Sequence, residues 1–125
     1  MAGKQIRVML VDDEPMFLQA VQALLELDDR IEVVGTSETG ESALEVADRQ
    51  HPDVALVDLG MPGMDGYEVT ELLLEHEPAL RVLAVSGLST ERDQLRAHEA
   101  GATAFLLKGG LHGEVAEAIV AAAGS

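Results

Sequence analysis

The stretch that decides the fold is VALVDLGMPGMDG, residues 54–66. Four apolar residues run without interruption into one acid, Asp58, and a loop rich in glycine and proline follows. An uninterrupted apolar run of this length is typical of a strand buried on both faces, as in parallel sheets. An acid directly after such a strand lies at its carboxyl end, where open α/β sheets bind their ligands. We therefore expect Asp58 to be the reactive group of the protein.

Composition limits what kind of protein this is. The chain has 125 residues, of which 47% are hydrophobic and 2% aromatic. This length suits one compact domain, so we expect residues 1–125 to form a single domain with an aliphatic core. Cysteine is absent, which excludes disulfides, thiol nucleophiles and zinc sites built on sulfur.

The charge of the chain bears on its partners and location. There are 23 acidic against 8 basic residues, a formal net charge of −15. Such a surface repels phosphate backbones, so we expect no direct binding of nucleic acid by this segment and no membrane association. No stretch approaches the ~18 apolar residues of a membrane span, and the N-terminus does not resemble a signal peptide. A cytoplasmic location is expected.

Four further apolar runs are predicted to be strands, and helical patterns separate them. The predicted strands cover residues 6–11, 31–35, 81–85 and 104–107. In the second of these runs, the polar Glu32 indicates an edge position. Alternating strands and helices predict an α/β fold, a doubly wound (βα)5 domain with a parallel five-stranded sheet. We expect the flavodoxin-like strand order 2-1-3-4-5.

The helix boundaries carry recognisable end signals. Pro15 is suited to a first helical turn, and Thr39 and Asp65 are suited to N-caps, the latter with Glu68 three residues on. Ser89 or Thr90 is expected to open the fourth helix. That helix is mostly polar, and its buried residues are expected to be Leu95 and the alanines. For the last helix, the apolar face is expected to include residues Leu111, Val115, Ala118, Ile119 and Ala122.

Polar residues directly follow the four strong strands. They are Asp12 and Asp13, Asp58, Ser86, and Lys108. In the expected strand order the first and third strands are neighbours, so their three carboxylates would share one pocket bordered by Ser86 and Lys108. Three close carboxylates need a counter-charge, and Mg²⁺ is typically held by carboxylates, waters and a phosphate. The set suits a carboxylate nucleophile attacking phosphorus, with an ammonium stabilising the phosphoryl oxygens.

Taken together, these residues resemble the receiver domain of two-component response regulators. The matching features are Asp12-Asp13, Asp58 with the loop MPGMDG at 61–66, Ser86-Gly87 and Lys108. The resemblance covers essentially the whole chain and implies a CheY-like fold. It implies a phosphorylation-activated switch, a phosphoacceptor that assists its own phosphorylation and dephosphorylation rather than a turnover enzyme.

The resemblance also implies residue roles. Asp58 would accept the phosphoryl group from the phosphohistidine of a sensor histidine kinase or phosphotransfer protein. Asp13, Asp58 and the backbone carbonyl of Gly60 would coordinate Mg²⁺, with Asp12 acting mainly through a water. Lys108 would bind the phosphoryl oxygens. Ser86 would move to the phosphoryl group and leave space for the switch residue Phe105, although an aromatic residue in a strand is more often simply part of the core.

Two departures from the family pattern stand out. Many receivers have proline after the lysine, whereas Lys108 precedes Gly109-Gly110, so a cis peptide is not expected. Receivers joined to helix-turn-helix DNA-binding domains often lack this proline, which points to regulation of transcription by an output domain not present in this chain. Gly60 stands where a larger side chain often screens the phosphoryl site, and Leu88 could not position an attacking water.

Alternative functions fit the residues less well. Residues 35–42 match a P-loop except that Glu41 replaces the lysine that binds phosphate. An aspartate-nucleophile phosphatase would use Asp12 but needs a second aspartate where Glu14 stands. A phosphorylation-independent interaction module on the same fold remains an alternative, against which the complete acid, hydroxyl and lysine set argues. Homodimerisation on phosphorylation is common in similar proteins, and the fourth helix, fifth strand and fifth helix are the expected output surface.

Overall fold

The computed structural model describes residues 4–87, 90–110 and 113–124. Within them five parallel strands alternate with five α-helices, and a short 3-10 helix follows the last strand. The strands are β1 (Ile6–Val11), β2 (Ile31–Ser37), β3 (Val54–Asp58), β4 (Arg81–Ser86) and β5 (Ala104–Leu107). The helices are α1 (Pro15–Glu26), α2 (Gly40–Gln50), α3 (Gly66–His76), α4 (Glu91–Ala100) and α5 (Val115–Ala123), with η1 at Lys108–Gly110.

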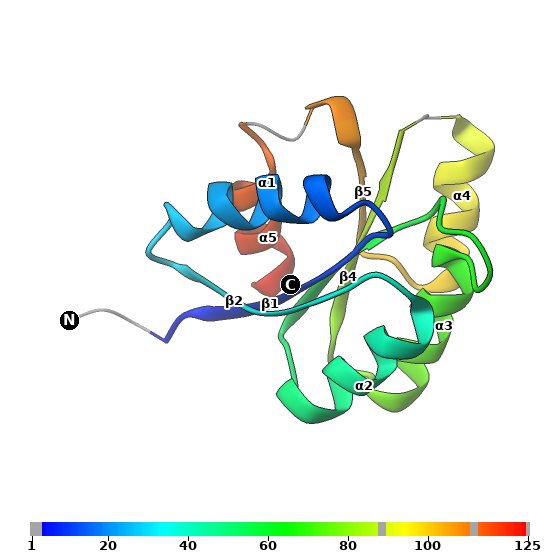
Figure 1. Cartoon of the computed structure of the whole chain (residues 1–125). Coiled ribbons are helices and arrows are strands. Elements are labelled where there is room, and N and C mark those ends of the chain that lie inside the picture. Colours follow the sequence, from blue (N-terminus) through cyan, green and yellow to red (C-terminus); the bar gives the residue numbers. More distant parts are fainter. Residues whose placement is uncertain (1–3, 88–89, 111–112, 125) are drawn as a thin grey trace.

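The sheet has the order β2-β1-β3-β4-β5, which confirms the predicted doubly wound fold. Helices α1 and α5 cover one face of the sheet, and α2, α3 and α4 cover the other (Figure 1). β3 lies in the middle, paired with β1 on one side and β4 on the other. The strand that ends in Asp58 is therefore covered by chain on every side except at its ends.

The strand predictions were close to the observed bounds. β1 and β5 match the predicted ranges, whereas β2 continues to Ser37, two residues beyond the predicted end. β2 is an edge strand, as Glu32 indicated, and Glu32 is exposed. The extension is decided by pairing: Ser37 is aligned with Val11 of β1, and its carbonyl accepts a hydrogen bond from the backbone N–H of Asp12.

Aliphatic side chains fill the two layers between sheet and helices. Every residue of β3 is buried, as the unbroken apolar run predicted. The layer under α1 and α5 contains residues such as Val8, Leu10, Leu25, Leu56 and Ile119. The layer under α2 and α3 contains residues such as Met9, Ala47, Val57, Val69 and Leu73. Burying aliphatic side chains on both faces at roughly 25 cal/mol per Å² stabilises the central strands most and holds their carboxyl ends in place.

The helix-end predictions are confirmed where the structure describes them. The Thr39 hydroxyl accepts a hydrogen bond from the N–H of Ser42 at 3.1 Å, and the Asp65 carboxylate accepts one from the N–H of Glu68 at 2.9 Å. Thr90 caps α4 in the same way. Ser89, the alternative, lies outside the described residues. Each cap satisfies a backbone donor that has no partner within its own helix.

Leu95 corrects one sequence prediction. It was expected to be buried in α4 with the alanines, but its side chain is 59% exposed, whereas Ala97 is buried. With 3.6 residues per turn, positions 95 and 97 point to nearly opposite sides of a helix, so both cannot face the sheet. Close packing of small alanines against the sheet decides which face turns inward.

The predicted apolar face of the last helix is confirmed for the residues that the structure describes. In α5 the residues Val115, Ile119 and Ala122 are buried, as predicted, and Ala118 packs against the same cluster. Leu111 lies outside the described residues.

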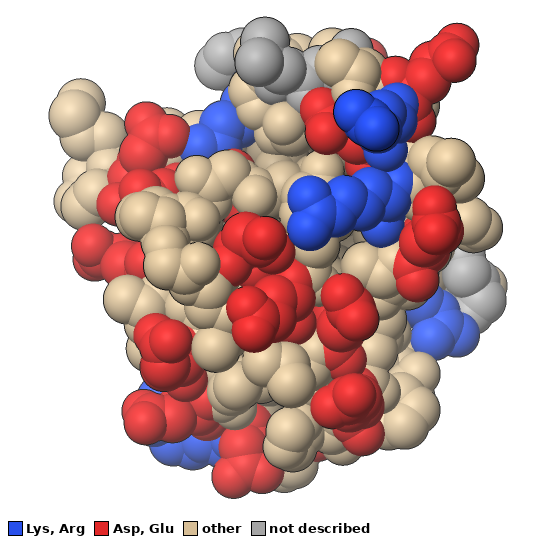
Figure 2. Space-filling model, turned by 90° about the vertical axis from the view of Figure 1, so that its right-hand side faces the viewer, with Lys and Arg blue, Asp and Glu red and all other residues tan. Residues whose placement is uncertain are grey.

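Across the described part of the chain, no helix combines the length and apolarity required to cross a bilayer. Acidic side chains are spread over the face that carries α3 and α4 (Figure 2).

Candidate functional site

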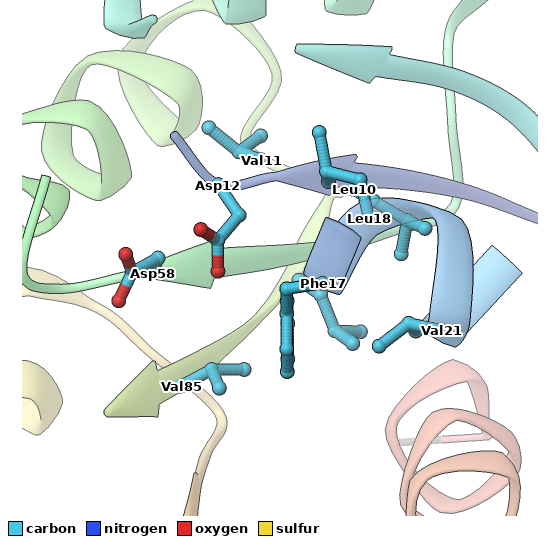
Figure 3. Close-up of a pocket in the computed structure, with 9 residues that line it drawn as sticks. Leu10, Val11, Asp12, Phe17, Leu18, Val21, Asp58 and Val85 are labelled. Carbon is cyan, nitrogen blue, oxygen red and sulfur yellow. The ribbon is translucent and has the colours of Figure 1, made fainter. Parts of the chain in front are cut away.

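Three carboxylates meet at the carboxyl edge of the sheet. Val11 of β1 is aligned with Val57 of β3, so the residues that follow each strand emerge side by side. One carboxylate oxygen from each of Asp12, Asp13 and Asp58 lies within 4.8 Å of the others. Figure 3 shows the carboxylates of Asp12 and Asp58 next to each other, the first after β1 and the second at the tip of β3. Strand pairing thus brings Asp58 together with acids that are 45 and 46 residues away in the chain.

Asp58 is a buried acid with its charge only partly compensated. It is 5% exposed, and its Oδ1 accepts a hydrogen bond from the N–H of Gly60 at 3.2 Å. Burial raises the pKa of Asp58, and the nearby charge of Asp13 adds to this, while Gly60 and Lys108 oppose it. Because the buried carboxylate of Asp58 accepts few hydrogen bonds, its oxygens keep lone pairs available for a new covalent bond or for a cation.

Asp12 is the most buried of the three acids. It is 1% exposed, and its Oδ1 accepts a hydrogen bond from the N–H of Glu14 at 2.9 Å. Its Oδ2 pairs with Lys108. Burial raises the pKa of Asp12, although both partners oppose the shift. Because each of its oxygens has a partner, Asp12 is less available for covalent chemistry than Asp58.

Lys108 brings the one ammonium group that pairs with these acids among the described residues. It opens the turn η1 directly after β5, and its Nζ lies 2.9 Å from Asp12 Oδ2, 2.6 Å from Glu14 Oε1 and 3.5 Å from Asp58 Oδ2. Burial opposes its charge, but the bonds to Asp12 and Glu14 outweigh burial and raise its pKa. The ammonium is therefore charged at neutral pH.

Ser86 and Phe105 lie on β4 and β5, the two strands beyond β3. Ser86 ends β4 opposite Leu107, the residue before Lys108, and both Ser86 and Phe105 are partly buried. Phe105 packs against a cluster that includes Leu59, Tyr67 and Ala97. Its position as a core residue and a role as a switch are both compatible with partial burial. Leu88, two residues after Ser86, lies outside the described residues.

The two glycine positions that depart from the family pattern have different consequences. A Cβ atom added at Gly60 would lie 3.8 Å from Asp58 Oδ1, an ordinary contact distance, so glycine is not required there by packing. Its small size leaves the approach to Asp58 open. At the other corner, the turn η1 takes the place of a proline turn, and the described residues contain no cis peptide.

Several residues at or near the site were not singled out for it from the sequence. Glu14 reaches Lys108, and the Phe17 ring lies under the same ammonium, with 4.6 Å between Nζ and the ring centroid. Tyr67 holds α4 against α3: Arg96 stacks on its ring at 4.0 Å, and its hydroxyl donates to Asp93. Glu14 could have been identified from the order Asp-Asp-Glu-Pro. It stands between the end of β1 and the proline that begins α1, so it must lie at the same edge of the sheet as Asp12 and Asp13. No sequence pattern near Phe17 or Tyr67 indicates that their rings contact Lys108 and Arg96.

The acids themselves form a donor set for a hard cation, whereas the cavity beside them is mainly apolar. A cavity beside Asp12 and Asp58 is lined mainly by apolar side chains and has a volume of about 10 Å³, about that of one water molecule (Figure 3). The donor set consists of hard carboxylate oxygens from three residues, which is the kind of set that Mg²⁺ prefers. These residues therefore fit a divalent cation, with Asp13 as the most exposed of the three.

Comparison with known proteins identifies a family and close structural relatives. The model of the "response regulator receiver domain" matches residues 8–120. The chain is 37% identical over 117 residues to the transcriptional regulatory protein NarL of Mycobacterium tuberculosis, covering 94% of this chain and 54% of that protein. It is 38% identical over 112 residues to a protein-glutamate methylesterase/protein-glutamine glutaminase of Methanospirillum hungatei, covering 87% of this chain and 32% of that protein.

A solved structure agrees with these sequence matches. The signal receiver domain of NarL from Mycobacterium tuberculosis superposes with a TM-score of 0.92 at 36% identity, covering 98% of this chain and 99% of that one. The expected similarity to receivers of transcription regulators is confirmed. The chain spans about half the length, or less, of the curated relatives described above.

Proposed function

Because this chain belongs to the family of response regulator receiver domains, we propose that it works through transfer of a phosphoryl group to Asp58. The whole chain, residues 1–125, is taken as one such domain. The observation that carries the proposal is the meeting of three carboxylates and one lysine at the end of the buried strand β3. Asp58 is the acid of this group whose second oxygen has only a 3.5 Å contact with Lys108.

The proposed reaction is a displacement at phosphorus. A carboxylate oxygen of Asp58 forms a bond to the phosphorus atom, and the bond from phosphorus to the imidazole nitrogen of a partner's phosphohistidine breaks. The imidazole keeps the electron pair of that bond and takes up a proton from water. Lys108 moves from its acidic partners toward the phosphoryl oxygens and balances their charge. Ser86, at the end of the neighbouring strand, donates a hydrogen bond to the same oxygens.

The proposed cofactor is Mg²⁺, bound by the acidic group. Asp13, Asp58 and the backbone carbonyl of Gly60 would hold Mg²⁺, with Asp12 acting through a water. When bound, Mg²⁺ supplies positive charge that offsets the charge of the carboxylates and of the phosphoryl oxygens. The three acids themselves provide the binding energy, because their mutual repulsion is relieved when a cation lies among them. The proposed reaction belongs in the cytoplasm, where Mg²⁺ and kinases are available.

The proposed output is a shift between two conformations. Movement of Ser86 toward the phosphoryl group makes room for Phe105 to turn inward, and α4 and β5 adjust. Two large apolar side chains on these elements support an output surface here: Leu95 is 59% and Leu107 45% exposed. A homodimer formed on phosphorylation, or contact with an attached DNA-binding domain, would cover them. The acidic surface supports an indirect role at DNA rather than direct binding by this segment (Figure 2).

The test uses acetyl phosphate, a small phosphodonor, with Mg²⁺ and a measurement of intact mass. The wild-type protein is expected to gain one phosphoryl group, and Asp58→Asn is expected to gain none. Asp48→Asn is the matched control, because Asp48 is an exposed acid near the end of α2 and is not part of the acidic group. Chelation of Mg²⁺ is expected to prevent labelling of the wild type. Equal labelling of Asp58→Asn would contradict the assignment, and no labelling of the wild type would favour a phosphorylation-independent interaction module.

A further inference from the structure

We infer that Glu14 is a positioning residue that competes with the phosphoryl group for Lys108 and so lowers the phosphoryl affinity of the domain. The inference rests on the proposed function, since it concerns the ammonium that the phosphoryl group would need. It adds a residue whose carboxylate touches neither the attacking oxygen nor the phosphorus atom. Glu14 acts through Lys108.

The contact distances show where the ammonium of Lys108 is held. Its Nζ lies 2.6 Å from Glu14 Oε1, closer than its 2.9 Å distance from Asp12 Oδ2 and its 3.5 Å distance from Asp58 Oδ2. A distance of 2.6 Å is at the short end for a charge-assisted hydrogen bond, whereas 3.5 Å is too long for a strong one. Lys108 is thus bound to Glu14 and Asp12 and only weakly to the proposed phosphoacceptor.

The backbone around Glu14 leaves its side chain available for this contact. Glu14 is the N-cap residue of α1, yet its side chain makes no capping hydrogen bond. The side chain is 62% exposed and spans to Lys108, which is 94 residues further along the chain. Phe17, one turn into α1, places its ring 4.6 Å from the same ammonium. Two residues at the start of α1 therefore hold the Lys108 ammonium near that helix: Glu14 by its charge and Phe17 by the face of its ring.

The consequence is a competition for one ammonium group. A phosphoryl group on Asp58 would gain most if Lys108 left Glu14, and leaving Glu14 costs the 2.6 Å ion pair. The pair is partly exposed, so it is weak compared with a buried ion pair. Neutralising Glu14 removes this cost before the phosphoryl group arrives. Binding of a phosphoryl analogue should then become about two- to tenfold tighter.

The experiment titrates beryllofluoride, a non-covalent analogue of the phosphoryl group, in saturating Mg²⁺ and follows the bound fluorine signal by NMR. Glu14→Gln removes the charge, and Glu14→Asp keeps the charge but shortens the side chain by one methylene group, which withdraws it from Lys108. Glu38→Gln is the matched control: Glu38 is an exposed acid at the same edge of the sheet, after β2, and is not among the described acids paired with Lys108. Thermal melting of each variant checks that the fold is unchanged.

The expected result is about two- to tenfold tighter beryllofluoride binding for both Glu14→Gln and Glu14→Asp, with Glu38→Gln like the wild type. Unchanged or weaker binding by Glu14→Gln overturns the inference. The inference is also overturned if Glu14→Gln binds more tightly but Glu14→Asp does not, or if Glu38→Gln gains as much as Glu14→Gln, because general repulsion of the anion would then be the cause. If the wild type itself binds no beryllofluoride, the proposed function fails, and this outcome is distinct from the others.

Discussion

The ammonium of Lys108 lies closer to Asp12 than to Asp58, at 2.9 Å against 3.5 Å. The two acids differ accordingly: Asp12 has a partner for each oxygen, whereas Asp58 has the N–H of Gly60 at 3.2 Å and only the distant lysine. Without a ligand, the positive charge of Lys108 thus lies closer to Asp12 than to the proposed phosphoacceptor Asp58. This asymmetry has consequences for stability that can be measured.

Substitution of Lys108 by methionine should destabilise the metal-free protein. The change leaves the buried Asp12 and Asp58 without their cation, and removing one member of a buried charge pair is costly. We expect a loss of about 3 kcal/mol in the free energy of unfolding at neutral pH. Urea denaturation with a chelator present measures it. Lys4→Met is the control, because Lys4 is exposed; an equal loss there would show that the effect is not specific to the site.

Substitution of Asp58 by asparagine should stabilise the metal-free protein at neutral pH. Burial raises the pKa of Asp58, so the folded state binds this proton more tightly than the unfolded state does. The wild type therefore loses stability as the pH rises from about 4 through the raised pKa, and Asp58→Asn does not. We expect a gain in the free energy of unfolding at pH 7 that shrinks toward pH 4. A difference that stays constant with pH would contradict this account.

Mg²⁺ should raise the melting temperature of the wild type, and Asp13→Asn should abolish most of this rise. A ligand that binds only the folded state stabilises it by about 1.4 kcal/mol at ten times its dissociation constant. Asp13 is the most exposed of the three acids, so its replacement removes a ligand without disturbing the core. Differential scanning fluorimetry with and without Mg²⁺ measures the shift. Asp48→Asn should respond like the wild type; a full Mg²⁺ response in Asp13→Asn would exclude Asp13 as a ligand.

Gly66→Ala should be one of the most damaging small substitutions. A Cβ atom at Gly66 would lie 2.2 Å from the backbone oxygen of Asp58 and 2.5 Å from the Cα of Leu59, and backbone atoms cannot move away cheaply. We expect a loss of about 3 kcal/mol in the free energy of unfolding, together with slower phosphorylation, because Asp58 itself is displaced.

Two other glycines provide the comparison for Gly66. Gly63 has φ +77° but nothing within 4 Å of its added Cβ, so Gly63→Ala should cost only about 1 kcal/mol of backbone strain. Gly113 has neither constraint, and Gly113→Ala should change stability by less than about 0.5 kcal/mol. Urea denaturation of the three variants gives the order. Equal losses at all three positions would show that close approach to Asp58 is not what requires glycine.

Residues with strong local signals could be placed from the sequence. The apolar run before Asp58 predicted a fully buried strand, and β3 is fully buried. Thr39 and Asp65 could be identified as caps because the bonds they make span three residues. The convergence of Asp12, Asp13 and Asp58 was also predictable, since parallel strands end at one edge and the strand order puts β1 next to β3.

Tertiary packing decided the rest. Leu95 looks like a core residue in a polar helix, yet the alanines pack against the sheet and turn it outward. The partners of Lys108 are separated from it by up to 96 residues, and the sequence alone did not show that Glu14 and Phe17 would meet its ammonium. Likewise Gly66 must be glycine only because the chain passes against Asp58 there.

The physical reason lies in the range of the forces. Apolar periodicity, capping and turns act between residues a few positions apart, so the sequence alone determined the strands, most helix faces and the three acids that meet at the edge of the sheet. The choice among several acids for one ammonium depends on differences of less than 1 Å in the distances between side chains from different elements. Those distances are set by the close packing of β1, β3, α1 and the turn after β5, and so the tertiary structure decided them.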